Sequence, residues 1–176
     1  MVNPAPGPHR QEAPGELERV RELLNSWLVP NDTREPTDRF AGYARQHGLT
    51  ATEAETVRGL RDDLRAAVEG SSGVDDVLNA WIAELGLGVR VSGGALTFRH
   101  EGGAPGELLA AVLRAVADGR WPRLKACPDC RWVFYDHTRN GRKRWCLMTA
   151  GGPDGRSCGS IAKVRRHRER AARAGH

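Results

Sequence analysis

Four cysteines constrain this chain more than any other feature of its sequence. All four lie between residues 127 and 158, and no other position of the 176-residue chain is a cysteine. Disulfide bonds are rare in a reducing compartment, so a cluster of thiols favours a metal site over two disulfide bonds. Buried free thiols or a redox pair are the alternatives, and neither explains why all four cysteines lie together. We therefore expect one site that uses all four side chains.

The spacing of the cysteines predicts a structural zinc site. Cys127 and Cys130 form a C-x2-C pair, which places two thiolates on one tight loop, and Cys146 and Cys158 complete a tetrahedron. The eleven residues between the last two ligands are rich in Gly, Pro and Ser, so this loop can bend back freely. His137 could replace a cysteine, but its place in a turn favours an exposed side chain. Four thiolates leave no open coordination position, so the expected cofactor is one structural Zn²⁺ rather than a catalytic one.

The residues between and after the cysteines predict a small zinc-braced fold. Residues 131–136 alternate and are rich in strand formers, residues 137–141 contain an Asn-Gly turn, and residues 142–146 return toward the metal. These three segments predict a β-hairpin. A helix is expected to follow Cys158, with Ser160 as its cap, so the fourth thiolate would lie at a helix N-terminus, where backbone dipoles stabilise negative charge. Knuckle, hairpin and helix in this order are typical of a treble-clef finger.

Charge divides the chain into two parts. Residues 1–120 carry 13 basic and 18 acidic side chains, a net charge of −5, whereas residues 121–176 carry 14 basic and 4 acidic side chains, a net charge of +10. A strong local excess of positive charge favours a polyanionic partner, most commonly nucleic acid. With the composition, this division predicts a flexible tail over residues 1–13, a helical domain over residues 14–120 and a zinc-finger domain that binds nucleic acid over residues 121–176.

Nine basic residues of the second part are candidate nucleic-acid contacts. They form one cluster in and after the predicted turn and a second set on the C-terminal helix: Arg139, Arg142, Lys143 and Arg144, and Lys163, Arg165, Arg166, Arg170 and Arg173. At about 100° per residue, most of the helical set forms a basic stripe, and Ile161, Val164 and Ala171 lie on the other side, where we expect them to pack on the zinc module. Such a stripe can follow phosphates, and arginine can also pair with guanine, so DNA is the expected partner.

Two alternatives to a DNA-binding helix stay open. RNA is another polyanion, and Trp132, Phe134 and Tyr135 could stack on unpaired bases. Their alternation in a predicted strand favours a place in the core of the hairpin instead. The basic C-terminal helix could also be only a solvated face or a flexible tail.

The acidic part predicts a helical domain with one hairpin. Apolar residues recur at three- and four-residue spacing in five segments, each of which predicts a helix. These segments are residues 14–30, 38–46, 52–69, 74–85 and 105–118. Residues 88–100 alternate around Gly93 and Gly94, which predicts a β-hairpin, and Trp27 and Trp81 are expected in the core. The expected fold class is mainly α, of the α+β type: a helical domain with one hairpin, then a treble-clef-like finger that ends in a basic helix.

Several function classes are disfavoured by the sequence. No stretch approaches the roughly 18 apolar residues of a membrane span, and the N-terminus lacks the apolar segment of a secretory signal. A cytoplasmic protein is therefore expected, associated with the nucleoid when bound to DNA. No Gly-rich phosphate loop, nucleophile elbow or His/Glu metal helix occurs, so an enzyme is not expected.

The chain resembles the bacterial CGNR zinc-finger family, in which an N-terminal domain of the ABATE type precedes the finger. The resemblance rests on CPDCRWVFYDHTRNGRKRWCLM, on CGSIAKVRRHRERA and more loosely on LLNSWL near the start. Family members are regarded as stress-related transcription regulators. The resemblance implies a finger that binds DNA, an N-terminal domain that senses or interacts, and the four cysteines as metal ligands. The chain departs from the family signature at Ser160 and Ile161, where Asn and Arg are usual, and in a longer loop before Cys158.

The expected function is that of a zinc-dependent DNA-binding transcriptional regulator. Its N-terminal domain is expected to bind a small-molecule effector or to form a homodimer. The alternative is a zinc-stabilised adaptor that binds an acidic protein without direct contact to nucleic acid. Salt-dependent binding of DNA by residues 121–176 would favour the regulator, because neutralising phosphates releases counterions.

Overall fold

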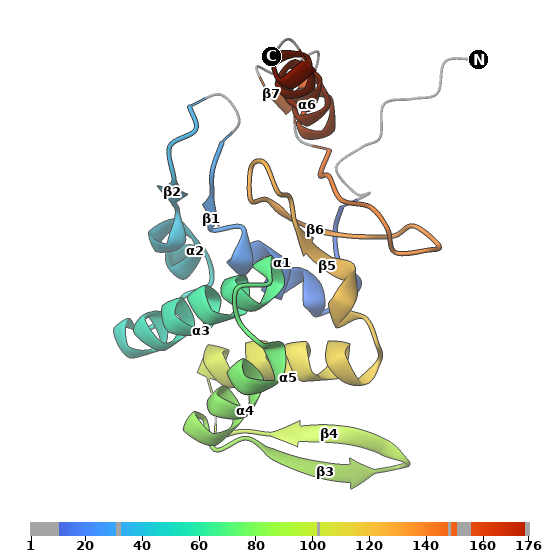
Figure 1. Ribbon diagram of the computed structural model, residues 1–176. Helices are drawn as coiled ribbons and strands as arrows, with labels where there is room; N and C mark the ends of the chain where they lie inside the picture. The colour runs from blue at the N-terminus through green and yellow to red at the C-terminus, as the bar shows by residue number, and fades with distance from the viewer. Residues whose placement is uncertain (1–10, 31–32, 102, 148, 151–155, 175–176) are drawn as a thin grey trace, which may run out of the picture.

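The computed structural model describes residues 11–30, 33–101, 103–147, 149–150 and 156–174. Within these residues, six α-helices and four two-stranded antiparallel sheets form an α+β fold, which confirms the expected fold class. Five helices lie together in the first part of the chain, and the sixth lies at the opposite end of the molecule from the hairpin β3–β4 (Figure 1). No helix of the described part is long and apolar enough to cross a membrane.

Helix α3 (Ala51–Glu69) is the centre of the N-terminal bundle. A capping box fixes its start: the Thr50 side chain accepts a hydrogen bond from the Glu53 backbone, and the Glu53 side chain accepts one from the Thr50 backbone. Gly70 ends the helix in the left-handed conformation, with a φ of 76°. The apolar side of α3 is buried against three other helices. These are α1 (Leu17–Leu24), α4 (Val74–Glu84) and α5 (Gly103–Ala117).

The predicted helix over residues 14–30 is too long. Helix α1 ends at Leu24, and Trp27–Leu28 form strand β1, which pairs with strand β2 (Thr37–Asp38). Helix α2 (Phe40–Gln46) follows directly. The chain after α1 therefore forms a small two-stranded sheet where a continuous helix was expected.

Arg61 of α3 holds this sheet in place. Its guanidinium, which is 3% exposed, donates two hydrogen bonds to the Asp38 carboxylate at 2.8 and 3.0 Å and one to the Ser26 hydroxyl at 3.1 Å. A buried guanidinium needs such acceptors, so the chain leaves the helical path where Ser26 and Asp38 can reach it. Trp27, at the start of β1, is half-buried rather than in the core, whereas Trp81 is buried as predicted.

The predicted hairpin in the acidic part is confirmed. Strand β3 (Gly88–Ser92) pairs antiparallel with strand β4 (Ala95–Arg99), and Gly93 and Gly94 form the turn with φ angles of 58° and 78°. The hairpin projects beyond α4 and α5 (Figure 1). One face carries three apolar side chains that are 60%, 72% and 52% exposed, those of Val89, Val91 and Leu96. This face is in contact with solvent.

The hydrophobic core does not divide at residue 121. The short 3-10 helix η2 (Trp121–Arg123) and the strands β5 (Leu124–Ala126) and β6 (Val133–Tyr135) bury side chains in the same apolar cluster as α1, α3 and α5. The boundary expected at this point follows the change of charge, whereas the core spans both sides of it. The hairpin of the basic part and the N-terminal bundle therefore form one packed unit.

The prediction of a flexible tail over residues 1–13 is wrong for residues 11–13. Gln11 and Ala13 are buried, and the Tyr135 N–H donates a hydrogen bond to the Gln11 carbonyl at 2.9 Å. The side-chain oxygen of Gln11 accepts a second one from the Leu147 N–H at 2.9 Å. Residues 11–13 thus pack along the basic part, and the rest of the expected tail lies outside the described residues.

Candidate metal centre and basic surface

The four predicted metal ligands converge on one point. All four side chains are buried, and their sulfur atoms all lie within 4.8 Å of one another. The Sγ atoms of Cys130, Cys146 and Cys158 are 3.4, 3.5 and 3.6 Å apart. A disulfide bond would bring two sulfur atoms to about 2.05 Å. Sulfur ligands about 2.3 Å from a zinc ion lie about 3.8 Å apart in a tetrahedron, so the geometry fits a tetrathiolate zinc site.

The first pair of ligands lies on the turn between β5 and β6. Cys127 directly follows β5, and its N–H donates to the Trp132 carbonyl at 2.9 Å, while the Arg131 N–H donates to the Cys127 carbonyl at 2.9 Å. Arg131 has a φ of 60°, the left-handed conformation that this tight turn requires. This turn, residues 127–132, is the zinc knuckle, and it connects β5 to β6 in a hairpin. The predicted pairing of residues 131–136 with residues 142–146 is wrong, because β6 pairs with β5 and residues 142–146 contain no strand.

The second pair of ligands is joined by another short hairpin. Strands β7 (Thr149–Ala150) and β8 (Arg156–Ser157) pair antiparallel, which brings Cys158 back beside Cys146. The bend expected from the Gly-rich composition falls on residues 151–155, which lie outside the described part of the chain.

Helix α6 (Cys158–Ala174) begins at the fourth ligand, as predicted. Its backbone dipoles stabilise a thiolate at this position. The cap is the Ser157 hydroxyl, which accepts a hydrogen bond from the Ser160 N–H at 3.3 Å, and not Ser160 itself. Trp145 covers the first turn, because a Cβ atom at Gly159 would lie 3.3 Å from the Trp145 ring. Glycine at this position lets the indole pack against the helix beside the metal ligands.

The ligand set consists of cysteines alone, and these need a cation to stay ionised. Interaction with the neighbouring thiols, Cys127 first, and burial raise the pKa of the Cys146 thiol above its usual range. A divalent metal offsets the repulsion between thiolates that lie so close together. His137 is not a ligand, because it is exposed and its Nε2 lies 2.7 Å from the carbonyl oxygen of Glu12.

The stretch that holds the cysteines also matches a known family. Residues 123–171 match the CGNR zinc finger. No curated protein matches the chain. The sulfur geometry and the match to the CGNR zinc finger together show that the four cysteines hold one structural zinc ion. The matched stretch, residues 123–171, is called the CGNR finger for this likeness.

The CGNR finger is joined to the N-terminal bundle by polar contacts that the sequence did not indicate. The Asn25 amide donates to the Val133 carbonyl at 2.8 Å, and its oxygen accepts from the Val133 N–H at 2.7 Å. Buried Arg65 donates to the carbonyls of Leu24 at 2.6 Å and Arg131 at 3.1 Å. The sequence contains one signal for these contacts, which is the place of Arg65 at the edge of the apolar stripe of α3. Arginine is usually exposed, so its burial there was not expected.

The aromatic residues of β6 belong to the core of the finger, as predicted. Phe134 is fully buried against the cysteine cluster, and Tyr135 is buried on the opposite side of the strand, in the cluster shared with the bundle. Neither ring offers a face on which a base could stack. Trp132, just before the strand, is only half-buried and packs against the cysteines.

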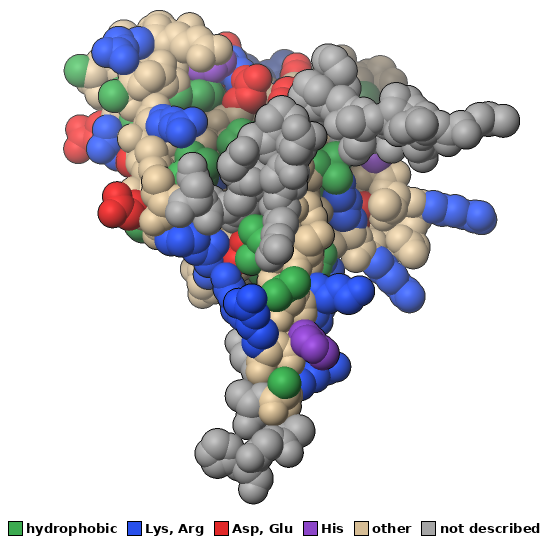
Figure 2. Space-filling model, turned by 90° about the horizontal axis from the view of Figure 1, so that it is seen from above, with side chains coloured by type: hydrophobic (Ala, Val, Ile, Leu, Met, Phe, Trp, Pro, Cys, Tyr) green, Lys and Arg blue, Asp and Glu red, His purple; other side chains and the backbone are tan. Residues whose placement is uncertain are grey.

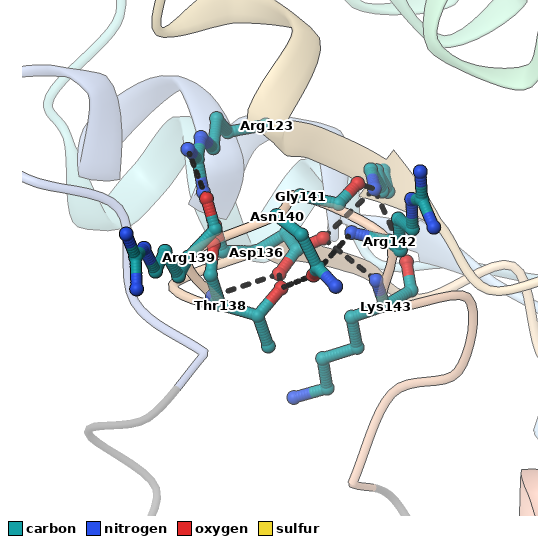
Figure 3. A network of polar contacts seen from close by, with 9 residues as sticks. Arg123, Asp136, Thr138, Arg139, Asn140, Gly141, Arg142 and Lys143 are labelled. Carbon is teal, nitrogen blue, oxygen red and sulfur yellow. Dashed lines mark hydrogen bonds and ion pairs between the residues drawn. The ribbon is translucent and has the colours of Figure 1, made fainter.

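The loop after β6 is organised by the buried carboxylate of Asp136 (Figure 3). It accepts hydrogen bonds from Lys125 Nζ and the Lys143 N–H, both at 2.8 Å, and from the Thr138 N–H at 2.9 Å. Burial raises the pKa of Asp136, but these hydrogen bonds outweigh it and hold the pKa below its usual range. Arg123 adds a hydrogen bond to the Asp136 carbonyl at 3.1 Å and another to the Thr138 carbonyl. The loop is therefore fixed by a network of charged groups.

This loop presents arginines to solvent. Arg139, Arg142 and Arg144 are exposed, and Figure 3 shows the first two pointing away from the Asp136 carboxylate. Lys143 is half-buried, with its Nζ 5.3 Å from the centre of the Phe134 ring. Three of the four predicted loop contacts are thus accessible to a partner, and the fourth packs on the finger.

Helix α6 projects from the metal site, and Lys and Arg side chains line it (Figure 2). All five predicted contacts on this helix are exposed: Lys163, Arg165, Arg166, Arg170 and Arg173. Arg165 also forms a 3.6 Å ion pair with Asp129 of the knuckle. The predicted apolar side is wrong, because Val164 is 37% exposed and Ala171 is exposed, which leaves only the half-buried Ile161 near the zinc module. Arg165 and Arg168 are exposed outside the predicted stripe, so the basic side chains of α6 are not confined to one face.

Proposed function

We propose that the chain is a zinc-dependent DNA-binding transcriptional regulator. The observation that carries this proposal is helix α6, which starts at a metal ligand and continues outward with no buried side chain among its described residues beyond Cys158. An α-helix fits the major groove of B-DNA, where Lys and Arg can bind both phosphates and guanine. The metal site fixes the direction in which this helix leaves the protein.

The charges of α6 favour a polyanionic partner. Lys163 and Arg166, Arg166 and Arg170, and Arg170 and Arg173 are three or four residues apart, so like charges are neighbours on the helix surface and destabilise it. Phosphates would relieve this repulsion. An acidic protein would too, but protein interfaces have an apolar core, and this helix exposes only Val164 as a large apolar side chain. DNA is therefore favoured over the adaptor role.

Loss of three helix cations is expected to weaken DNA binding strongly. In the variant K163A/R166A/R170A of the zinc-loaded chain, each lost phosphate contact should reduce the slope of log K against log salt by about 0.9. The slope should therefore fall by about 3 if all three residues contact phosphates. Fluorescence anisotropy with a labelled duplex over a range of salt concentrations measures both the affinity and the slope.

The matched control removes three exposed arginines of the acidic part, as R45A/R90A/R99A. It should bind DNA like the unaltered chain. Equal loss in both variants would show that net charge alone governs binding. Absence of DNA binding together with capture of an acidic protein would establish the adaptor role. Tighter binding of single-stranded RNA than of duplex DNA would make RNA the partner in place of DNA.

For the N-terminal part we propose an ABATE-type domain that binds a small-molecule effector or forms a homodimer. Its acidic charge makes it unsuited to DNA. Its core is continuous with the finger, so binding of a ligand or of a second copy to this part can alter the packing of the finger beside the metal site. In this proposal the chain acts by binding and not as an enzyme, in the cytoplasm at the nucleoid.

The hairpin β3–β4 supports the homodimer. Its apolar face is exposed, and two such faces can pack on each other about a two-fold axis, which would bury Val89, Val91 and Leu96 of both copies. V91E/L96E is expected to shift the protein from dimer to monomer in analytical ultracentrifugation. S92E, on the opposite face of the hairpin, should leave the dimer intact. A monomeric unaltered protein at high micromolar concentration would contradict this role.

A further inference from the structure

A cavity separates helices α1 and α2 from the zinc knuckle. Its volume is about 360 Å³, which is within the range of small-molecule sites. The residues that matter for its chemistry come from three separate segments: Glu22 of α1, Arg39, Tyr43 and His47 of α2 and its ends, and Trp132 of the knuckle. The cavity therefore lies between the N-terminal bundle and the CGNR finger, and both contribute to its walls.

Three polar groups of this cavity make no well-formed hydrogen bond within the described chain, although the charge of Arg19 lies near the first of them. They are the Tyr43 hydroxyl, His47 Nε2 and Trp132 Nε1, and they are half of the six buried side-chain nitrogen and oxygen atoms in that state. Tyr43 itself is only 7% exposed. Buried polar groups in proteins almost always have hydrogen-bond partners. Three such groups around one cavity point to a ligand.

The free groups are mainly neutral donors. The indole N–H of Trp132 can only donate. Burial raises the pKa of the Tyr43 phenol, although the nearby guanidinium of Arg19 acts in the opposite direction, so the phenol is a donor at neutral pH. Burial and the positive charge of Arg19 both lower the pKa of His47, which disfavours the charged imidazolium. Arg39 is exposed, and no carboxylate of the described chain pairs with its guanidinium. The cavity thus offers two donors and one cation to an acceptor-rich group.

The cavity also offers one acceptor and flat aromatic faces. Glu22 lines it with a carboxylate, whereas Arg21, which lines it too, is already paired with Glu18 at 2.5 Å. The rings of Tyr43 and His47 lie with their centres 4.1 Å apart. A planar ring can pack on such faces, and a hydroxyl or amino group on that ring can donate to Glu22.

We propose that this cavity binds a small aromatic acid, a planar ring that carries a carboxylate and a hydroxyl or amino group. The carboxylate accepts hydrogen bonds from Trp132 and Tyr43 and pairs with Arg39. The ring packs on Tyr43, and its hydroxyl or amino group donates to Glu22. This assignment rests on the effector-binding role proposed for the N-terminal part and does not depend on DNA binding.

Trp132 connects such a ligand to the metal site. Its carbonyl accepts the hydrogen bond from the Cys127 N–H at 2.9 Å, and its ring packs against the cysteine cluster. Asn25 also lines the cavity while it holds the Val133 backbone of the finger. A ligand in the cavity therefore contacts residues that position the CGNR finger.

Titration of the full-length, zinc-loaded chain with 4-hydroxybenzoate and 2-aminobenzoate, followed by calorimetry and amide NMR without DNA, tests this site. At least one acid should bind with a dissociation constant of about 1 mM or below. Y43F and W132F each remove one donor and keep an aromatic ring, so each should weaken binding about ten-fold. Y135F alters the other tyrosine of the chain, which lies outside the cavity, and should bind like the unaltered protein.

Three results would overturn the assignment. The first is that neither acid binds. The second is that Y43F and W132F bind as tightly as the unaltered chain, which would place the ligand elsewhere. The third is that the neutral 4-hydroxybenzamide binds as tightly as the acids, which would show that the site does not select a carboxylate. A DNA titration on the same samples is independent of these readouts. Failure to bind DNA with intact acid binding would remove the regulator role and leave the site.

Discussion

Removal of zinc is expected to unfold the CGNR finger and to release helix α6. The four sulfur atoms lie within 4.8 Å of one another. Removal of the metal breaks the four zinc–sulfur bonds and leaves four buried thiols without a bond that holds them together. Zinc binding contributes about 10–16 kcal/mol to small zinc fingers, which is as large as the roughly 5–15 kcal/mol that stabilises a whole domain. The first turn of α6 packs beside the cysteines and the rest is exposed, so the helix should lose its structure and its DNA affinity together.

Circular dichroism at 222 nm and metal analysis during titration with a strong chelator measure this effect. C158S, which removes one ligand, should show the same loss of helix without chelator. S157A at the neighbouring position removes only a helix cap and should cost about 1 kcal/mol. A chelated protein that keeps both its helix content and its salt-dependent DNA binding would contradict the prediction, because α6 would then fold without the metal.

The unfolding should extend beyond the finger in part. Strands β5 and β6 share their apolar cluster with α1, α3 and α5, and Asn25 holds the backbone of Val133. Loss of the knuckle should therefore weaken amide protection in α1 more than in α4, which has no hydrogen bond to the finger among the described residues.

The zinc site could be predicted because its chemistry is local in sequence. A C-x2-C pair sets the geometry of one half-site, and concentration of all four cysteines in one segment leaves one site as the simplest account. The start of α6 at Cys158 and the hairpin at Gly93 and Gly94 were predictable for the same reason, since caps and turns depend on a few adjacent residues.

The errors concern choices that tertiary contacts make. Residues 142–146 follow a good turn, but β6 pairs with β5. The Asp136 carboxylate accepts hydrogen bonds from Lys125 of β5 and from the Lys143 N–H, and these contacts hold the loop after β6 away from a strand pairing with β6. The apolar side predicted for α6 has no surface to pack on, because the helix leaves the protein after its first turn. The cavity at Tyr43 and Trp132 joins segments about 90 residues apart, and no spacing rule connects them.

Replacement of Asp136 by Asn is expected to destabilise the protein by about 3 kcal/mol at neutral pH. The carboxylate is fully buried and accepts from Lys125 Nζ and from the backbone of Thr138 and Lys143. An amide of the same shape removes the negative charge beside Lys125 and turns one acceptor into a donor that faces another donor. Urea denaturation of the zinc-loaded proteins measures the difference. D118N, at an exposed carboxylate of the acidic part, should change stability by less than about 0.5 kcal/mol.

The effect of D136N should depend on pH with a defined sign. The pKa of Asp136 is lowered in the folded protein from its ordinary value of 3.8, so the unfolded chain takes up the proton first as pH falls. The stabilisation from this carboxylate is therefore complete at neutral pH and decreases as pH falls below about 4. The difference between the two proteins should be largest at neutral pH and shrink toward the acid limit of folding. Loss of metal in acid affects both proteins, so it cancels in this difference. A difference that stays constant from pH 7 to the acid limit would show that Asp136 acts by its shape and not by its charge.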